Sequence, residues 1–185
     1  IDCHQRFHRR TLHRFLSSIL EQGNPYWIED PVNGTADFRW ARERYPELQW
    51  AGGETASGIP DLLKTIQQQA CDVLMPDVKH CGGVSSLQTL IPLVEAMGRK
   101  ISLHNPSGPI STAFSAQATA LCRQPLPLEF AWERSNERAK TVSPAEPQSN
   151  GKYHLSHHPG IGLKPDPDFL KDCGALWQKG DWKNT

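Results

Sequence analysis

The feature that most constrains this chain is a repeated alternation of short strand-like and longer helix-like stretches. The strand-like stretches are apolar, and they span residues 1–4, 26–29, 48–54, 72–77, 100–105 and 126–130. The helix-like stretches carry apolar residues at helical spacing, and they span residues 11–22, 37–45, 58–70, 85–98 and 111–122. Because strand and helix follow each other repeatedly, the sequence predicts parallel strands joined by crossover helices.

Proline and glycine refine the predicted helix limits. Pro60 falls near the first turn of the helix predicted over 58–70, where proline is tolerated. Gly98 is a C-terminal stop signal for the helix predicted over 85–98. Pro92 inside that stretch predicts either a kink or a later start.

A polar residue that could carry chemistry stands at the C-terminal end of each predicted strand. These residues are Asp2 and His4, Glu29, Glu54, Asp77, His104 and Glu129. A closed barrel brings all such ends to one mouth, whereas an open doubly wound sheet spreads them along an edge. Convergence accounts for the whole set, so we predict an α/β fold of the TIM-barrel type. Six strands are found where a barrel has eight, so we expect about two βα units to be missing from the front of a longer protein.

Residues 1–163 are predicted to form one partial barrel with its C-terminal wrap, and residues 164–185 to form a tail. The stretch after Glu129 is rich in Pro, Gly, Ser and His, which is typical of an ordered segment wrapping a domain rather than of a new domain. The last residues, from Cys173 onward, are predicted to form a short frayed helix and a loose end.

Composition excludes several classes of partner. The 20 basic and 20 acidic residues balance, which gives no electrostatic reason to expect nucleic acid or an anionic membrane as a partner. The basic stretch 4–14 is interpreted as the solvated start of a helix. No apolar run approaches the roughly 20 residues of a membrane span. Five widely spaced cysteines without a CxxC motif predict reduced thiols in a cytoplasmic protein.

Three acids at successive strand ends, Asp2, Glu29 and Glu54, form a candidate metal site. Carboxylate oxygens without a nearby thiolate suit Mg²⁺, and three crowded carboxylates would repel one another without a cation. The alternative is that each acid caps a helix, since βα loops often carry such a residue. Two of the acids stand in the settings "IEDP" and "GGET", and we favour the metal site.

Two histidines are candidates for proton transfer. His104 ends one strand and Asp77 ends its neighbour, so Asp77 could orient the imidazole and stabilise its charged form. His4 lies two residues beyond Asp2, and the strand period of two predicts that both face the barrel mouth, with His4 as a proton donor. The remaining histidines are predicted to lie on the surface: His8, His13, His80, His154, His157 and His158.

Taken in order, "IDCH", "WIEDPV", "AGGET", "LMPDVKHCGGV", "LHNPSGPIST" and "PLEF" resemble the C-terminal barrel of the enolase superfamily, mandelate racemase subgroup. The likeness is strongest to its acid-sugar, galactonate-type dehydratases, and it extends to the closing "HHPGIGL". The resemblance implies a modified (β/α)7β barrel that carries Mg²⁺ on the three strand-end acids. It also implies a sugar acid as the substrate and a 2-keto-3-deoxy sugar acid as the product.

The resemblance also implies roles for single residues. His104, paired with Asp77, would remove the proton α to the substrate carboxylate. Glu129 would hydrogen-bond the carboxylate or the enediolate, and His4 would protonate the departing β-hydroxyl. Expelling hydroxide near neutral pH needs such a donor.

The sequence departs from this pattern in ways that leave alternatives open. The family's capping domain and the first two barrel strands, with the Lys motif that serves racemases as a second base, are not in this sequence. Gln5 stands in "HQR" where galactonate-type enzymes tend to have glycine, and Asp30 replaces a more usual Glu. A racemase or epimerase, a sugar-acid binding module and an inert truncated barrel therefore stay open. The barrel edges are expected to favour a homo-oligomer.

Overall fold

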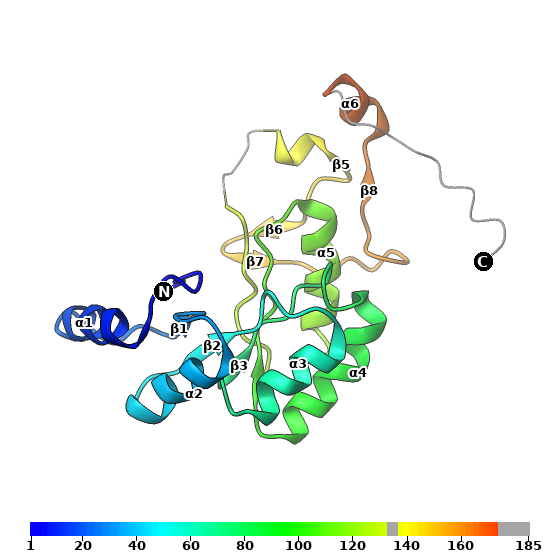
Figure 1. Ribbon diagram of the computed structural model, residues 1–185. Coiled ribbons are helices and arrows are strands. Elements are labelled where there is room, and N and C mark those ends of the chain that lie inside the picture. The colour runs from blue at the N-terminus through cyan, green and yellow to red at the C-terminus, as the bar shows by residue number, and fades with distance from the viewer. Residues whose placement is uncertain (133–136, 174–185) are drawn as a thin grey trace.

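The computed structural model describes residues 1–132 and 137–173, and its centre is a parallel sheet (Figure 1). Within the described residues this sheet has four strands in the order β1 (Ile28–Glu29), β2 (Trp50–Gly52), β3 (Val73–Leu74) and β4 (Lys100–Ile101). Neighbouring strands are consecutive in the chain and all pairs are parallel. The helices between them act as crossovers, so the predicted TIM-barrel type of α/β fold is confirmed.

The predicted helices all form, with small changes at their ends. The structure has α1 (Arg9–Leu20), α2 (Thr35–Arg44), α3 (Gly58–Gln67), α4 (Gly83–Ala96) and α5 (Pro109–Thr119). Figure 1 shows α3 and α4 side by side along one face of the sheet. Helix α4 begins at Gly83 and continues through Pro92, so the later start predicted from that proline is wrong. Four buried apolar residues hold α4 against the core despite the proline: Leu87, Leu90, Ile91 and Val94.

The period of two along the strands gives the sheet two different apolar faces. The larger core lies between sheet and helices, and Ile28, Trp50 and Leu74 are fully buried in it. The opposite face carries Ala51, Val73 and Met75, with Trp27 and Leu126 packed against them. The other fully buried large side chains include Leu12, Leu16, Leu62 and Leu103.

Two predicted strands are wrong in the part of the chain that is described. Residues 1–4 form only an isolated parallel bridge between Asp2 and Glu29, because the chain turns at His4 and Gln5 with positive φ angles of 49° and 56°. Residues 126–130 are not a strand either. Pro127 has no N–H for a ladder, and side chains bind this segment instead: the Ser102 Oγ donates to the Pro127 carbonyl at 2.7 Å.

Beyond residue 137 the chain forms small elements around the C-terminal side of the sheet. These are the 3-10 helix η1 (Arg138–Lys140), the strands β5 (Val142–Ser143), β6 (Gln148–Ser149), β7 (Lys152–Tyr153) and β8 (Lys164–Pro165), and helix α6 (Pro167–Asp172). Strand β8 pairs with β5, which fastens the first residues of the predicted tail to the wrapping segment. The division at residue 163 stays a prediction, and the frayed end predicted after Cys173 lies outside the described residues.

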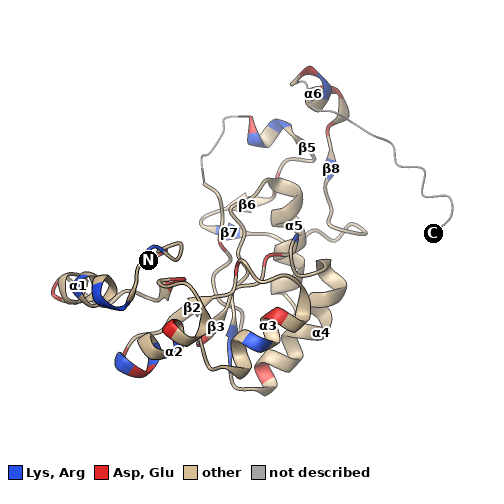
Figure 2. Cartoon of the chain, viewed as in Figure 1, with Lys and Arg blue, Asp and Glu red and all other residues tan. Residues whose placement is uncertain are grey.

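The predictions for the histidines and cysteines agree with the structure. The six histidines predicted to be superficial are exposed, and all five cysteines, which lie within the described ranges, are free thiols. Figure 2 shows acidic and basic residues interspersed along α2 and α3. Arg9 at the basic start of α1 pairs with Asp37 of α2 at 2.7 Å. Of the helices described, none has both the length and the apolar character that crossing a membrane requires.

Candidate active site

The carboxyl ends of the parallel strands bring the predicted site residues to one edge of the sheet. Glu29 ends β1, and Glu54, Asp77 and His104 follow β2, β3 and β4 within three residues. A parallel bridge between Asp77 and His104 extends the pairing beyond the assigned strands. As predicted, the three acids and His104 therefore lie at the carboxyl ends of neighbouring strands of the sheet.

Close packing at this edge requires glycine at one position. A Cβ atom added to Gly52 would lie 2.4 Å from the Asp30 Oδ1 and 2.6 Å from a ring carbon of Phe38. Real Cβ atoms do not approach other heavy atoms this closely, so a larger residue would require the Asp30 and Phe38 side chains to shift.

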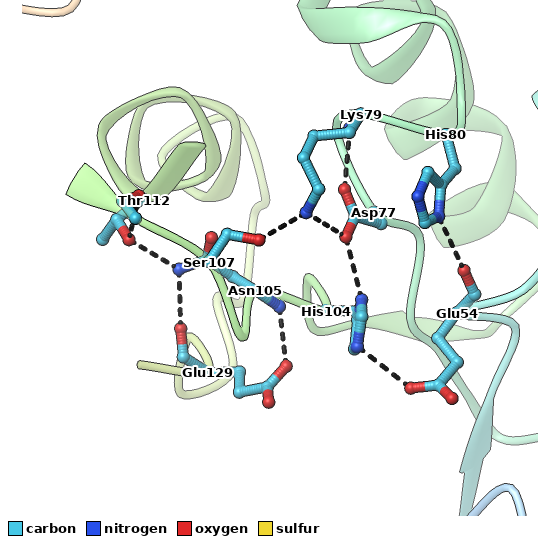
Figure 3. Close-up of polar contacts among 10 residues, drawn as sticks. Glu54, Asp77, Lys79, His80, His104, Asn105, Ser107, Thr112 and Glu129 are labelled. Atoms are coloured by element: carbon cyan, nitrogen blue, oxygen red, sulfur yellow. Dashed lines mark hydrogen bonds and ion pairs between the residues drawn. The ribbon is translucent and has the colours of Figure 1, made fainter. Parts of the chain in front are cut away.

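The His104 ring lies between two carboxylates (Figure 3). Its Nδ1 is 2.9 Å from the Asp77 Oδ2, and its Nε2 is 3.0 Å from the Glu54 Oε2. The His104 side chain is 14% exposed and Asp77 is fully buried. A carboxylate at Nδ1 favours the tautomer with the proton on that nitrogen, which leaves the Nε2 lone pair to accept a proton from a bound molecule.

Asp77 stays an anion despite its burial. Burial alone raises the pKa of Asp77, but hydrogen bonds from Lys79 and His104 outweigh it, and the net pKa is lowered. The Lys79 Nζ donates to the Asp77 Oδ2 at 2.6 Å, and the Lys79 backbone N–H donates to Oδ1 at 2.7 Å. His104 and Asp77, called the dyad from here on, therefore combine an oriented imidazole with a fixed negative charge.

The predicted metal ligands influence one another electrostatically. Burial, together with the charges of Asp2, Glu129 and Glu54, raises the pKa of Glu29 to about 7, and a hydrogen bond from the Trp27 indole opposes this shift. The Glu54 Oε2 is buried and forms no hydrogen bond with a described residue, although it lies 3.0 Å from His104. Carboxylate oxygens are the type of donor that a hard divalent cation prefers, so the chemistry of this set, though not yet its arrangement, suits such an ion.

The three predicted ligands each contact another group in this structure. Asp2 lies 2.5 Å from His4, Glu29 accepts from the Trp27 Nε1 at 3.2 Å, and Glu54 lies beside His104. In residues 1–132 and 137–173, no three His, Cys, Asp or Glu side chains are arranged so that they could hold a metal ion. The ligand set Asp2, Glu29 and Glu54 therefore stays a prediction.

His4 lies beside Asp2, but a turn rather than a strand brings the two residues together. The contact between the His4 Nε2 and the Asp2 Oδ2 is made in a left-handed turn at His4, so the strand-period argument is wrong. Both side chains are largely exposed, at 57% for His4 and 42% for Asp2. The proton-donor role of His4 stays a prediction.

Glu129 is held next to the dyad by a residue that the sequence did not single out. The Asn105 backbone N–H donates to the Glu129 Oε2 at 2.6 Å, and the Asn105 Nδ2 donates to the Glu129 carbonyl at 3.0 Å. Asn105 is fully buried and directly follows His104. Glu129 therefore lies beside the loop that carries His104, and its catalytic role stays a prediction.

Sequence reasoning missed Lys79 and Asn105 as residues of the site. Their only sequence signals were proximity to a candidate, Lys79 in "PDVKH" and Asn105 in "LHNP". Asp30, which directly follows Glu29, is 4% exposed. Burial and, to a smaller extent, the charge of Glu54 raise the pKa of Asp30 to about 7, while a backbone hydrogen bond from Gly53 opposes the shift.

The fold and this edge define a protein of the (β/α)-barrel class with acids and a histidine–carboxylate dyad at the strand ends. The chain belongs to the family described as Enolase C-terminal domain-like, whose model matches residues 1–169. The family predicted from the motifs is therefore confirmed.

Curated relatives are similar over nearly the whole chain. A D-xylonate dehydratase of Haloferax volcanii is 29% identical over 171 residues, which cover 92% of this chain and 41% of that protein. A D-gluconate/D-galactonate dehydratase of Picrophilus torridus is 25% identical over 176 residues, 92% of this chain and 44% of that protein. The chain thus spans less than half the length of these relatives.

A solved structure of a mandelate racemase/muconate lactonizing enzyme-like protein from Rubrobacter xylanophilus has a similar fold. It superimposes with a TM-score of 0.84 at 25% identity, over 97% of this chain and 46% of that chain. The described barrel portion therefore has the arrangement found in about half of that protein.

Proposed function

We propose that this chain forms the part of a Mg²⁺-dependent acid-sugar dehydratase that holds its proton-transfer residues. The observation that carries the proposal is the His104 ring, bound at Nδ1 by the buried Asp77 and directed at Nε2 toward the strand-end acids. The dehydratase names of the two relatives support the reaction class. The sugar acid would be the small-molecule partner. We also propose that the protein forms a homo-oligomer and acts in the cytoplasm.

His104 would act as the general base. Its Nε2 would take the proton from the carbon α to the substrate carboxylate, and the electron pair of the C–H bond would pass into an enediolate. Asp77 would hold the resulting imidazolium in place, since its charge faces Nδ1. The α-proton of a carboxylate is very weakly acidic, so the site must also stabilise the new negative charge.

Asp2, Glu29 and Glu54 would hold the Mg²⁺ ion. Their donor atoms are hard carboxylate oxygens. The pKa of Glu29 is raised to about 7, mainly by its burial and secondarily by neighbouring carboxylates such as Asp2. When bound, the cation would supply positive charge beside the enediolate oxygens. Glu129, held by Asn105, would donate a hydrogen bond to the same oxygens when protonated.

His4 would act as the general acid. The β-hydroxyl of the substrate would leave as water with a proton from the His4 imidazolium, and the enol that forms would tautomerise to the 2-keto-3-deoxy acid. Asp2 lies 2.5 Å from the His4 Nε2 and would hold the ring in position for this step. The exposed position of His4 leaves it accessible to a substrate.

Product analysis tests this function. The protein is incubated with Mg²⁺ and single sugar acids, starting with xylonate, gluconate and galactonate, and 2-keto-3-deoxy acids are followed by NMR. We expect one product with loss of the β-hydroxyl, and none with His104→Asn. Inversion at the α-carbon without loss of water would instead indicate an epimerase, and no change in any sugar acid would contradict the proposal.

A further inference from the structure

Lys79 links the two carboxylate oxygens of Asp77 to the loop that follows β4. Its backbone N–H donates to the Asp77 Oδ1 and its ammonium donates to Oδ2, so one residue hydrogen-bonds both oxygens of the carboxylate. The ammonium also contacts the Ser107 Oγ at 2.5 Å, as Figure 3 shows. The Asp77 Oδ2 is the same atom that binds His104, so Lys79 acts on the oxygen that orients the ring.

The Ser107 end of this link is itself firmly anchored. The Ser107 carbonyl accepts a hydrogen bond from the Arg138 Nη1 at 2.6 Å. Arg138 forms a bidentate ion pair with Glu146, at 2.6 Å and 2.8 Å, and these side chains are only 12% and 4% exposed. Paired guanidinium and carboxylate groups in this geometry are rigid, so the wrapping segment fixes the position of Ser107.

The Arg138 guanidinium also supports the loop at a second point. Its Nη2 donates to the Thr112 Oγ1 at 2.8 Å, and the Asn105 Nδ2 donates to the same oxygen at 2.9 Å. Asn105 directly follows His104 and binds Glu129. The base and the predicted acid Glu129 are therefore both tied to Arg138 through short polar contacts.

We propose that Lys79 is a positioning residue for His104: its ammonium, held by Ser107, turns the Asp77 carboxylate so that Oδ2 binds the Nδ1 of the ring. If only the backbone N–H of Lys79 held Oδ1, the Asp77 carboxylate could still rotate about that hydrogen bond and move Oδ2. With the ammonium in place, both oxygens are fixed. The role of the ring in catalysis rests on the proposed function, whereas the orientation itself does not.

The simplest competing explanation is that Lys79 only neutralises the charge of the buried Asp77. Both explanations predict a loss of stability when the charge is removed, so stability cannot separate them. They differ for Ser107→Ala, which keeps the Lys79–Asp77 charge pair and removes only the atom that anchors the ammonium. Positioning predicts a change at His104 in that variant, and neutralisation predicts none.

The test uses NMR of the protein labelled with ¹⁵N-histidine. A ring N–H in a hydrogen bond to a carboxylate is protected from exchange and gives a downfield proton signal, which is assigned by its absence in His104→Asn. We expect this signal in the wild type, in Lys79→Arg and in the exposed control Lys64→Met. We expect it to be broadened or lost in Lys79→Met and in Ser107→Ala, each verified as folded by circular dichroism.

Two results would overturn the proposal. One is an unchanged His104 N–H signal in folded Lys79→Met, and the other is an unchanged signal in Ser107→Ala. If Lys79→Met does not fold, Ser107→Ala decides alone, because it removes a single hydroxyl group. Once a substrate is identified, the proposal that Lys79 positions His104 also predicts a kinetic effect. In Lys79→Met, kcat should fall about tenfold or more while KM stays within about twofold.

The NMR measurement separates this inference from the proposed function. It needs no substrate, so failure to turn over any sugar acid would leave its outcome intact. Conversely, an unchanged N–H signal in a protein that dehydrates sugar acids would reject positioning by Lys79 and keep the dehydratase.

Discussion

Asp77 is fully buried, yet its Oδ2 lies 2.9 Å from the Nδ1 of the His104 ring. A buried carboxylate is costly unless it is bound by cations and hydrogen-bond donors, and here Lys79 and His104 supply both. The pair lies beyond the ends of the neighbouring parallel strands β3 and β4, where Asp77 and His104 also form a backbone bridge. The fold thus fixes the distance between the two residues.

Replacing Asp77 by Asn should greatly slow proton abstraction with little effect on sugar-acid binding. An amide can hold the opposite tautomer of His104 and cannot stabilise the imidazolium, so kcat should fall by about 10²-fold to 10⁴-fold. The measurement is steady-state kinetics on the best sugar acid. Asp168→Asn on α6 is the matched control, because Asp168 is exposed and lies far along the chain. Full activity in Asp77→Asn would contradict the dyad.

The metal-free protein should become less stable as the pH rises from about 4 to above 7. The pKa of Asp30 is raised from 3.8 to about 7 on folding, so between these values the folded state holds a proton that the unfolded state releases. Glu29, raised to about 7, acts in the same direction. Urea unfolding in EDTA at a series of pH values measures the free energy of unfolding.

Asp30→Asn should reduce this pH dependence and stabilise the metal-free protein at about pH 8. The amide oxygen can still accept from Gly53, and the buried charge is gone. Asp61→Asn, at an exposed acid of α3, is the control and should leave the slope unchanged. A variant with the wild-type slope would show that Asp30 is not the titrating group.

Mg²⁺ should raise the unfolding temperature of the wild type at neutral pH. Binding to the native state alone adds about 2.7 kcal/mol when the free ion is 100 times its Kd. Glu54→Gln should reduce this effect, because it removes one predicted carboxylate ligand. Differential scanning fluorimetry across a Mg²⁺ titration measures both proteins. An identical response of wild type and Glu54→Gln would exclude Glu54 as a ligand.

Arg138→Met should destabilise the protein by about 3–5 kcal/mol, because it leaves the buried Glu146 carboxylate unpaired. The matched control is Arg39→Met, which removes the exposed Arg39–Glu43 pair and should cost about 0.5 kcal/mol or less. Both values come from urea unfolding at one pH. Equal losses in the two variants would show that burial of the Arg138–Glu146 pair has no energetic consequence.

The sequence was sufficient for features that depend on local periodicity. Leu12 and Leu16 stand four residues apart and mark α1. The acid at the end of β1 and the acid after β2 mark the edge of the sheet where the site lies. Parallel order then brings Glu29, Glu54 and His104 together without further information. The family follows from the same motifs.

Other features depend on contacts that no local pattern encodes. The left-handed turn at His4 and Gln5 uses no glycine, so a strand was predicted there. Arg138 and Glu146 form their pair only because the wrapping segment returns to the loop of Ser107. Lys79 resembles an ordinary surface lysine until the burial of Asp77 is known.

The most direct test of the central claim is exchange of the substrate α-proton with solvent in D₂O. The wild-type protein with Mg²⁺ should incorporate deuterium at the α-carbon of at least one sugar acid, and His104→Asn should abolish this while the exposed control His157→Asn retains it. Equal incorporation by wild type and His104→Asn would contradict the assignment of His104 as the base.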